Sequence, residues 1–155
     1  MENIEGKKIL EEITKEVLEK MGISGDIYIA NDLSTDSTLT TVEIQSNDSS
    51  YLIGKNGTNL ASLQHIIRAI FRRKTGLQLD FIVDVNGYKE GRKIHFIQLA
   101  KDAAAEAIRE GKSVDLPPMN SFERRTVHME LQKMEGIKTE SFGKGDERYI
   151  VVSPK

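Results

Sequence analysis

The sequence predicts an α+β protein built from two small units in tandem. Apolar residues recur at helical spacing in several segments, short β-branched or alternating stretches lie between them, and glycines follow the helical segments as stops. The chain has 155 residues, 38% of them hydrophobic, which suffices for two small cores. Asn86-Gly87 marks the seam, so we expect units at residues 1–86 and 87–155.

The first unit reads as helix, strand, strand, helix, glycine turn, helix and strand. Gly22 and Gly76 end the two longer helices, and the second of these has an apolar face that includes Leu60 and Ile66. The expected elements are a helix to Met21, strands at 27–29 and 39–45 around a polar loop at 31–37, a helical turn at 49–53, a helix from Thr58, and a strand at 79–85.

The second unit begins with a long helix, about residues 88–110, that also connects the two units. Pro117-Pro118 then breaks the chain. Asn120 is placed to cap the next helix, with Glu123 at the capping-box position. The remaining expectations are the end of this helix near Met134 and two strands at 137–142 and 148–152, joined by a turn at 143–146.

Composition excludes several classes of function. The net charge is −2 and the pI is about 6.0, so affinity for a polyanion requires a locally basic surface. The chain has no cysteine, which removes disulfides, thiolate nucleophiles and zinc fingers. His65, His95 and His128 fall on separate elements, so we expect no enzyme, no metal and no cofactor. No membrane-length apolar run or apolar export signal is present, and we expect a cytoplasmic protein.

Positive charge concentrates between residues 49 and 79. This window holds no Asp or Glu and carries +5, so the remainder of the chain carries −7. Such a concentration indicates an electrostatic footprint for a phosphate backbone. The alternative is a solvated helix whose cations suit the C-terminal end of the helix dipole. The cations are Lys55, Arg68, Arg72, Arg73 and Lys74.

The turn Gly54-Lys55-Asn56-Gly57 lies between two helical segments of this window. Glycine has no Cβ, so the backbone can approach a phosphate closely, and Lys55 adds a charge there. The helix that starts at Thr58 points unpaired N–H groups and the positive end of its dipole toward the same place. A simple helix–helix connector is the alternative, because a lone G-x-x-G is common.

The string from Leu52 to Leu63, Leu-Ile-Gly-Lys-Asn-Gly-Thr-Asn-Leu-Ala-Ser-Leu, resembles the I-G-x-x-G-x-x-L/I-x-x-L/I core of KH domains. The order of elements resembles the bacterial-type (type II) KH domain, α-β-β-α-α-β. The resemblance implies a groove for about four nucleotides, with the G-x-x-G loop clamping the backbone. Ile53 and Leu60 would lie at its apolar wall or just beneath it, and core packing is favoured for Leu60.

Arg124 and His128 form a second candidate site on the helix after the prolines. Four residues apart, they share a helical face and could grip one phosphate or stack on one base, while Arg125 points toward a flank. An ordinary solvated helix is the alternative. Lys144 and Arg148, at the edge of the predicted hairpin, are further candidates.

The segment from Met119 to Val152 resembles the small α/β nucleic-acid-binding domain named for its R-x-x-x-H signature. The matching stretches are Leu116–Met119, Glu123–Arg125, His128, Ser141–Gly143 and Glu147–Tyr149. A KH unit followed by this domain resembles the Jag family of bacterial RNA-binding proteins, also called KhpB or EloR. Members commonly carry an additional N-terminal domain and linker, so we expect a short member or a truncated chain.

Together these observations predict a protein that binds single-stranded RNA, or single-stranded DNA, without catalysing a reaction. The resemblance implies an RNA chaperone or post-transcriptional regulator tied to cell elongation, division and shape, with a second KH protein as a partner. The alternative is a protein-interaction adaptor or ribosome-associated factor that uses the same modules for docking. Binding that weakens steeply with salt would favour the nucleic-acid reading.

Overall fold

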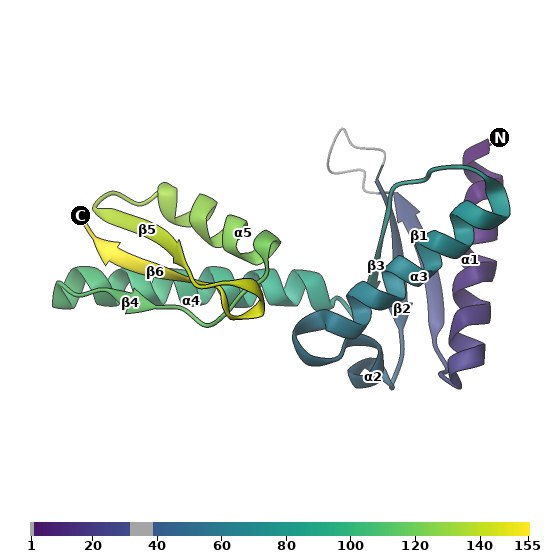
Figure 1. The fold of residues 1–155 in the computed structure, drawn as a ribbon, viewed down its shortest axis with the longest axis horizontal. Coiled ribbons are helices and arrows are strands. Elements are labelled where there is room, and N and C mark those ends of the chain that lie inside the picture. The colour runs from purple at the N-terminus through teal and green to yellow at the C-terminus, as the bar shows by residue number, and fades with distance from the viewer. Residues whose placement is uncertain (1, 32–38) are drawn as a thin grey trace. The chain divides into compact units, whose positions relative to one another are not determined.

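The structure, a computed structural model, describes residues 2–31 and 39–155. The chain divides into two compact units, Met1–Lys89 and Glu90–Lys155, whose elements are labelled in Figure 1. The polar loop expected at 31–37 lies outside the described residues, apart from Asn31 at the end of the first strand. None of the described helices combines the length and apolar character that crossing a membrane requires.

The first unit is a three-stranded sheet with helices on one face (Figure 1). The strand order is β1-β2-β3, with β1 antiparallel to β2 and β2 parallel to β3. A parallel pair needs a crossover connection, which the helices between β2 and β3 supply. In order, the elements are α1 (Glu2–Met21), β1 (Asp26–Asn31), β2 (Thr40–Gln45), α2 (Ser49–Ile53), the 3₁₀ turn η1 (Lys55–Gly57), α3 (Thr58–Thr75) and β3 (Phe81–Val85).

Alternation along the strands gives this sheet one buried face, which packs against α1 and α3. Leu60, expected in the core, is 2% exposed. Ile66, which was also expected on the buried face of its helix, is 48% exposed. That expectation was wrong because α3 contacts the core through a narrower stripe, and a residue one step from Ile67 turns away from it. The stripe consists of Leu60, Leu63, Ile67 and Phe71.

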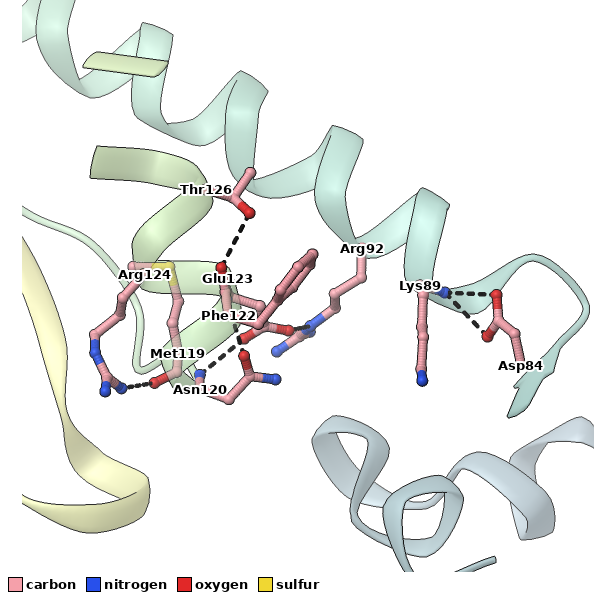
Figure 2. Close-up of polar contacts among 9 residues, drawn as sticks. All are labelled: Asp84, Lys89, Arg92, Met119, Asn120, Phe122, Glu123, Arg124 and Thr126. Atoms are coloured by element: carbon pink, nitrogen blue, oxygen red, sulfur yellow. Dashed lines mark hydrogen bonds and ion pairs between the residues drawn. The ribbon is translucent and has the colours of Figure 1, made fainter. Parts of the chain in front are cut away.

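Two carboxylates of the first unit hold the start of the next helix, α4 (Tyr88–Glu110). Glu43 Oε1 accepts a hydrogen bond from the Gly87 N–H at 2.9 Å, and both Asp84 oxygens accept from the Lys89 N–H at 3.2 Å (Figure 2). A helix start leaves such N–H groups without intrahelical partners. Burial raises the pKa of both carboxyls and lowers the pKa of Lys89, whose Nζ donates to Gln64 Oε1 at 3.3 Å.

The second unit pairs two helices with an antiparallel sheet of order β4-β6-β5. The two-residue strand β4 was not predicted, because Val114 and Asp115 are too short a stretch to show alternation. The predicted helix ends at Gln132 rather than near Met134, and the last strand continues to Pro154. After α4 the elements are β4 (Val114–Asp115), α5 (Ser121–Gln132), β5 (Ile137–Phe142), the 3₁₀ turn η2 (Gly145–Glu147) and β6 (Tyr149–Pro154).

The predicted capping box at the start of α5 is present. Asn120 Oδ1 accepts from the Glu123 N–H at 2.9 Å, and Glu123 Oε2 accepts from the Asn120 N–H at 3.0 Å. The other Glu123 oxygen accepts from Arg92 Nε of α4 at 2.7 Å (Figure 2). Glu123 is only 7% exposed, so this one carboxylate joins α4 to the first turn of α5 inside the unit.

Glu123→Ala is expected to destabilise the second unit by about 3 kcal/mol, because it removes both the cap and the buried carboxylate that Arg92 meets. Glu130→Ala, on the same helix, is the matched control. Its ion pairs with Lys101 and Lys133 involve exposed ammonium groups, so its cost should stay below about 1 kcal/mol. Hydrogen exchange of the α5 amides measures both effects within this unit. Equal protection in the two variants would contradict the role given to Glu123.

Asp84→Asn is expected to stabilise the first unit near pH 7. Asparagine keeps an oxygen for the Lys89 N–H but removes a charge that burial disfavours. Because the pKa of Asp84 is raised in the folded protein, the wild type gains stability as pH falls through that pKa. The advantage of the variant should therefore shrink as the pH approaches about 4. Urea unfolding at both pH values measures this, and an advantage that grows on acidification would disprove it.

Candidate nucleic-acid interface

The glycine turn between α2 and α3 is held in a left-handed conformation. Gly54, Asn56 and Gly57 have φ values of 70°, 54° and 77°. A Cβ on Gly54 would approach Asn59 Cγ to 2.5 Å, and one on Gly57 would lie 3.1 Å from Tyr88 Cε1. Both glycines are thus required by the backbone angles and by contacts within the protein. The approach of a phosphate to this backbone stays a prediction.

The polar residues of the turn face solvent. Lys55, Asn56 and Thr58 are exposed, and Gly54 and Gly57 are half-buried. Thr58 Oγ1 donates to the Lys55 carbonyl at 2.9 Å, and no side chain caps the start of α3. The Lys55 ammonium takes part in none of the ion pairs formed among residues 2–31 and 39–155. A backbone N–H end and an exposed ammonium therefore lie at one solvent-facing corner.

The turn is flanked by residues that pack in the core of the first unit. Ile53, the last residue of α2, is half-buried and packs against the core of the first unit, while Leu60 is fully part of that core. Asn59 Nδ2 donates to the Tyr51 carbonyl at 2.9 Å and ties α3 back to α2. These contacts fix the two helices that flank the turn, so its shape does not depend on a ligand.

The five cations of the basic window do not act alike. Arg68 donates to the Phe81 carbonyl at 3.0 Å and lies over the Phe81 ring, with 5.6 Å between Cζ and the centroid. Lys74 forms an ion pair with Glu16 of α1 at 3.5 Å. Both therefore contact other elements of the first unit, a role that neither interpretation of the window predicted. Arg72 and Arg73 are exposed, as is Lys55.

A hollow of about 510 Å³ lies between the C-terminal half of α3 and residues 77–80. The side chains of His65, Arg72 and Arg73 contribute to its wall, and Asp80 adds a carboxylate. We did not predict this feature from the sequence. The sequence signal that bears on it is Leu77, an apolar residue that directly follows the helix-ending Gly76 and precedes the predicted strand. In the structure Leu77 is 50% exposed and lines the hollow.

In the second unit, Arg124 and His128 are already engaged by neighbouring groups. Arg124 donates to the Met119 carbonyl (Figure 2). It also donates to Ser121 Oγ at 3.2 Å. His128 Nδ1 is hydrogen-bonded to Thr139 Oγ1 of β5. The predicted pair therefore attaches α5 to the backbone at Met119 and to β5. Arg124 is half-buried. His128 is exposed, and its Nε2 lies 3.0 Å from Gln132 Nε2, so both ring nitrogens have hydrogen-bond partners.

The remaining predicted residues lie on more open surface. Arg125 is exposed on α5, and Lys144 is exposed just before η2. Arg148 Nε donates to Ser141 Oγ at 2.8 Å, and its carbonyl accepts from the Met119 N–H at 3.0 Å. Met119 thereby brings the hairpin next to the backbone that Arg124 holds. The two carboxylates of η2, Asp146 and Glu147, follow Lys144 in the chain and weaken its field.

Titratable side chains elsewhere give no sign of a metal centre. Within the described part of the chain, no group of three or more histidine, aspartate or glutamate side chains is arranged to hold a metal ion.

Comparison with known proteins places this chain in a family. Residues 95–154 match the R-x-x-x-H domain, the domain whose signature is an arginine, three residues and a histidine. RNA-binding protein KhpB of Clostridium symbiosum is 31% identical over 154 residues, which cover 99% of this chain and 68% of that protein. The proteins of the same name from Lactiplantibacillus plantarum and Bacillus subtilis are 30% and 36% identical, and the matches cover 41% and 51% of their lengths. The chain therefore belongs to the KhpB family and contains an R-x-x-x-H domain.

Proposed function

We propose that this chain binds single-stranded RNA through two sites, one in each unit, and catalyses no reaction. The exposed turn Gly54–Gly57, opening onto the uncapped start of α3 beside Lys55, is the observation that carries the proposal. The match to the R-x-x-x-H domain and the RNA-binding relatives support it independently. We also propose that residues 1–86 are a type II KH domain, because the element order and the turn agree with that resemblance.

In the first unit, one phosphate is held at the turn. The Lys55 ammonium supplies charge, and the start of α3 adds the positive end of its dipole at the same corner, where the Thr58 N–H itself already donates to the Lys55 carbonyl. Asn56 is exposed beside them, and Ile53 supports the turn from below. Arg72 and Arg73, exposed cations roughly 21 Å further along α3, would meet more distant phosphates of the strand near the hollow beside residues 77–80.

In the second unit, Arg125 and His128 hold phosphate groups, His128 by exchanging its contact with the exposed Gln132 amide for one with the phosphate. Lys144 and Arg148 extend this surface at the hairpin. Arg124 acts mainly by positioning the backbone at Met119. Each site alone is small, but two sites on one chain raise each other's effective concentration when a strand reaches both.

The cellular setting follows from the resemblance and remains a prediction. It comprises a cytoplasmic post-transcriptional role connected with cell elongation or division, and a second KH protein as partner. If the chain instead docks to a protein or ribosomal surface, it should show no affinity for short RNA.

The double variant Lys55→Asp, Asn56→Asp is expected to weaken single-stranded RNA binding about tenfold or more, because it places two carboxylates where a phosphate should lie. The slope of log affinity against log salt should also fall by about 0.7 for each phosphate that the variant no longer neutralises. Lys20→Asp on α1, which reverses an exposed cation far in sequence from the turn, is the charge-reversal control. Wild-type affinity and slope in the double variant would rule out this site.

Arg125→Ala combined with His128→Ala is expected to weaken RNA binding by about fivefold to fiftyfold. The loss should be similar across sequences, since phosphate contacts do not read bases. Lys133→Ala, a cation just past the end of α5 that pairs with Glu130, should change affinity little. Fluorescence anisotropy with a labelled oligonucleotide measures the RNA affinity of the wild type, the double variant and Lys133→Ala. Equal affinities for the double variant and the wild type would exclude α5 from the interface.

A further inference from the structure

The two acidic residues of α5 are both neutralised inside the second unit. Glu123 is 7% exposed and meets Arg92 and the capping-box N–H. Glu130 is half-buried and pairs with Lys101 of α4 and with Lys133. The negative charges of the helix are therefore turned toward the protein and compensated there.

The outward face of α5 carries no carboxylate. Phe122, Arg125 and Met129 follow one another at helical spacing along it, and His128 and Gln132 lie beside them. Phe122 is 66% exposed and Met129 is 54% exposed. A cation flanked by exposed apolar side chains is therefore open to solvent on a face that no negative charge shares.

The backbone that carries the Phe122 ring is anchored by hydrogen bonds and an ion pair. It belongs to the first helical turn, between Asn120 and Glu123, whose two reciprocal hydrogen bonds and ion pair to Arg92 anchor the backbone (Figure 2). Thr126 Oγ1 donates to the Phe122 carbonyl at 3.0 Å. An aromatic side chain has only two torsions to order, so binding against it costs little conformational entropy.

We propose that Phe122 is a base-stacking platform for an unpaired nucleotide of the strand whose phosphates Arg125 and His128 hold. This inference rests on the proposed function and deepens it. An aromatic face next to cations is the combination with which proteins bind single strands, because every base has a π-face and every nucleotide carries a phosphate. The absence of carboxylates on this face favours a polyanion over a basic protein segment as the occupant.

Phe122 would give the second unit its preference for single strands over duplexes. Bases in a duplex are stacked on their neighbours and present no free face, whereas an unpaired base can turn onto the ring. The second unit should therefore prefer single strands over duplexes, and the preference should depend on the ring rather than on the cations.

Phe122→Ala and Phe122→Trp test this, with Met129→Ala as a matched control on the same face. The probes are a short oligouridylate and an abasic oligonucleotide with the same number of phosphates. We expect Phe122→Ala to weaken oligouridylate binding by about fivefold to a hundredfold and to change abasic binding little. Met129→Ala should stay within about twofold of the wild type. The wild-type chain has no tryptophan, so the emission of Phe122→Trp reports on this position alone, and the oligouridylate should quench it while the abasic probe does not.

Wild-type oligouridylate affinity in Phe122→Ala would overturn the inference while leaving the proposed function intact. An equal loss for both probes, or a loss in Met129→Ala as large as in Phe122→Ala, would also overturn it, since neither depends on a base stacked on the ring. If the wild-type chain binds neither probe at any salt concentration, the proposed function fails and this inference fails with it.

Discussion

The geometry of the second unit depends on the contacts that the Glu123 carboxylate makes. It closes the capping box of α5 with one oxygen and meets Arg92 of α4 with the other. Because the side chain is buried, removing either partner would leave a polar group without compensation. Every exposed residue of α5 that we assign to the interface is displayed by the helix that this carboxylate orients. The capping box therefore supports the proposed interface as well as marking the start of the helix.

The first unit fixes its turn by a different device. Backbone conformation, rather than an ion pair, sets the geometry, since Gly54 and Gly57 adopt positive φ angles and their missing side chains leave room for Asn59 and Tyr88. Both units thus fix the start of a helix beside their candidate residues. One does so through hydrogen bonds to a carboxylate, and the other through steric freedom at glycine.

Much of this arrangement could be predicted from local patterns. The helix boundaries at Gly22 and Gly76, the capping box at Asn120, and the hairpin at the C-terminal end depend on a few neighbouring residues. Other features depend on residues distant in the chain. Arg68 looked like a free cation because its partner, the Phe81 carbonyl, lies on another element. The hydrogen bond between His128 and Thr139, and the short strand β4, likewise require the fold. The binding roles of the predicted residues remain predictions.

Each sheet combines one strand pairing that is local in sequence with one that joins distant parts of the chain, Thr40 with Phe81 in the first unit and Val114 with Val152 in the second. In the second unit, β5 and β6 are joined by a tight connection, with Phe142 paired to Tyr149, so this hairpin can nucleate locally. In the first unit, the parallel pairing of Thr40 with Phe81 requires that both intervening helices already be compact. The Gly54–Gly57 turn lies within that closing loop. A side chain at either glycine would therefore delay completion of the sheet and prolong the time during which the edge of β2 is open to wrong partners.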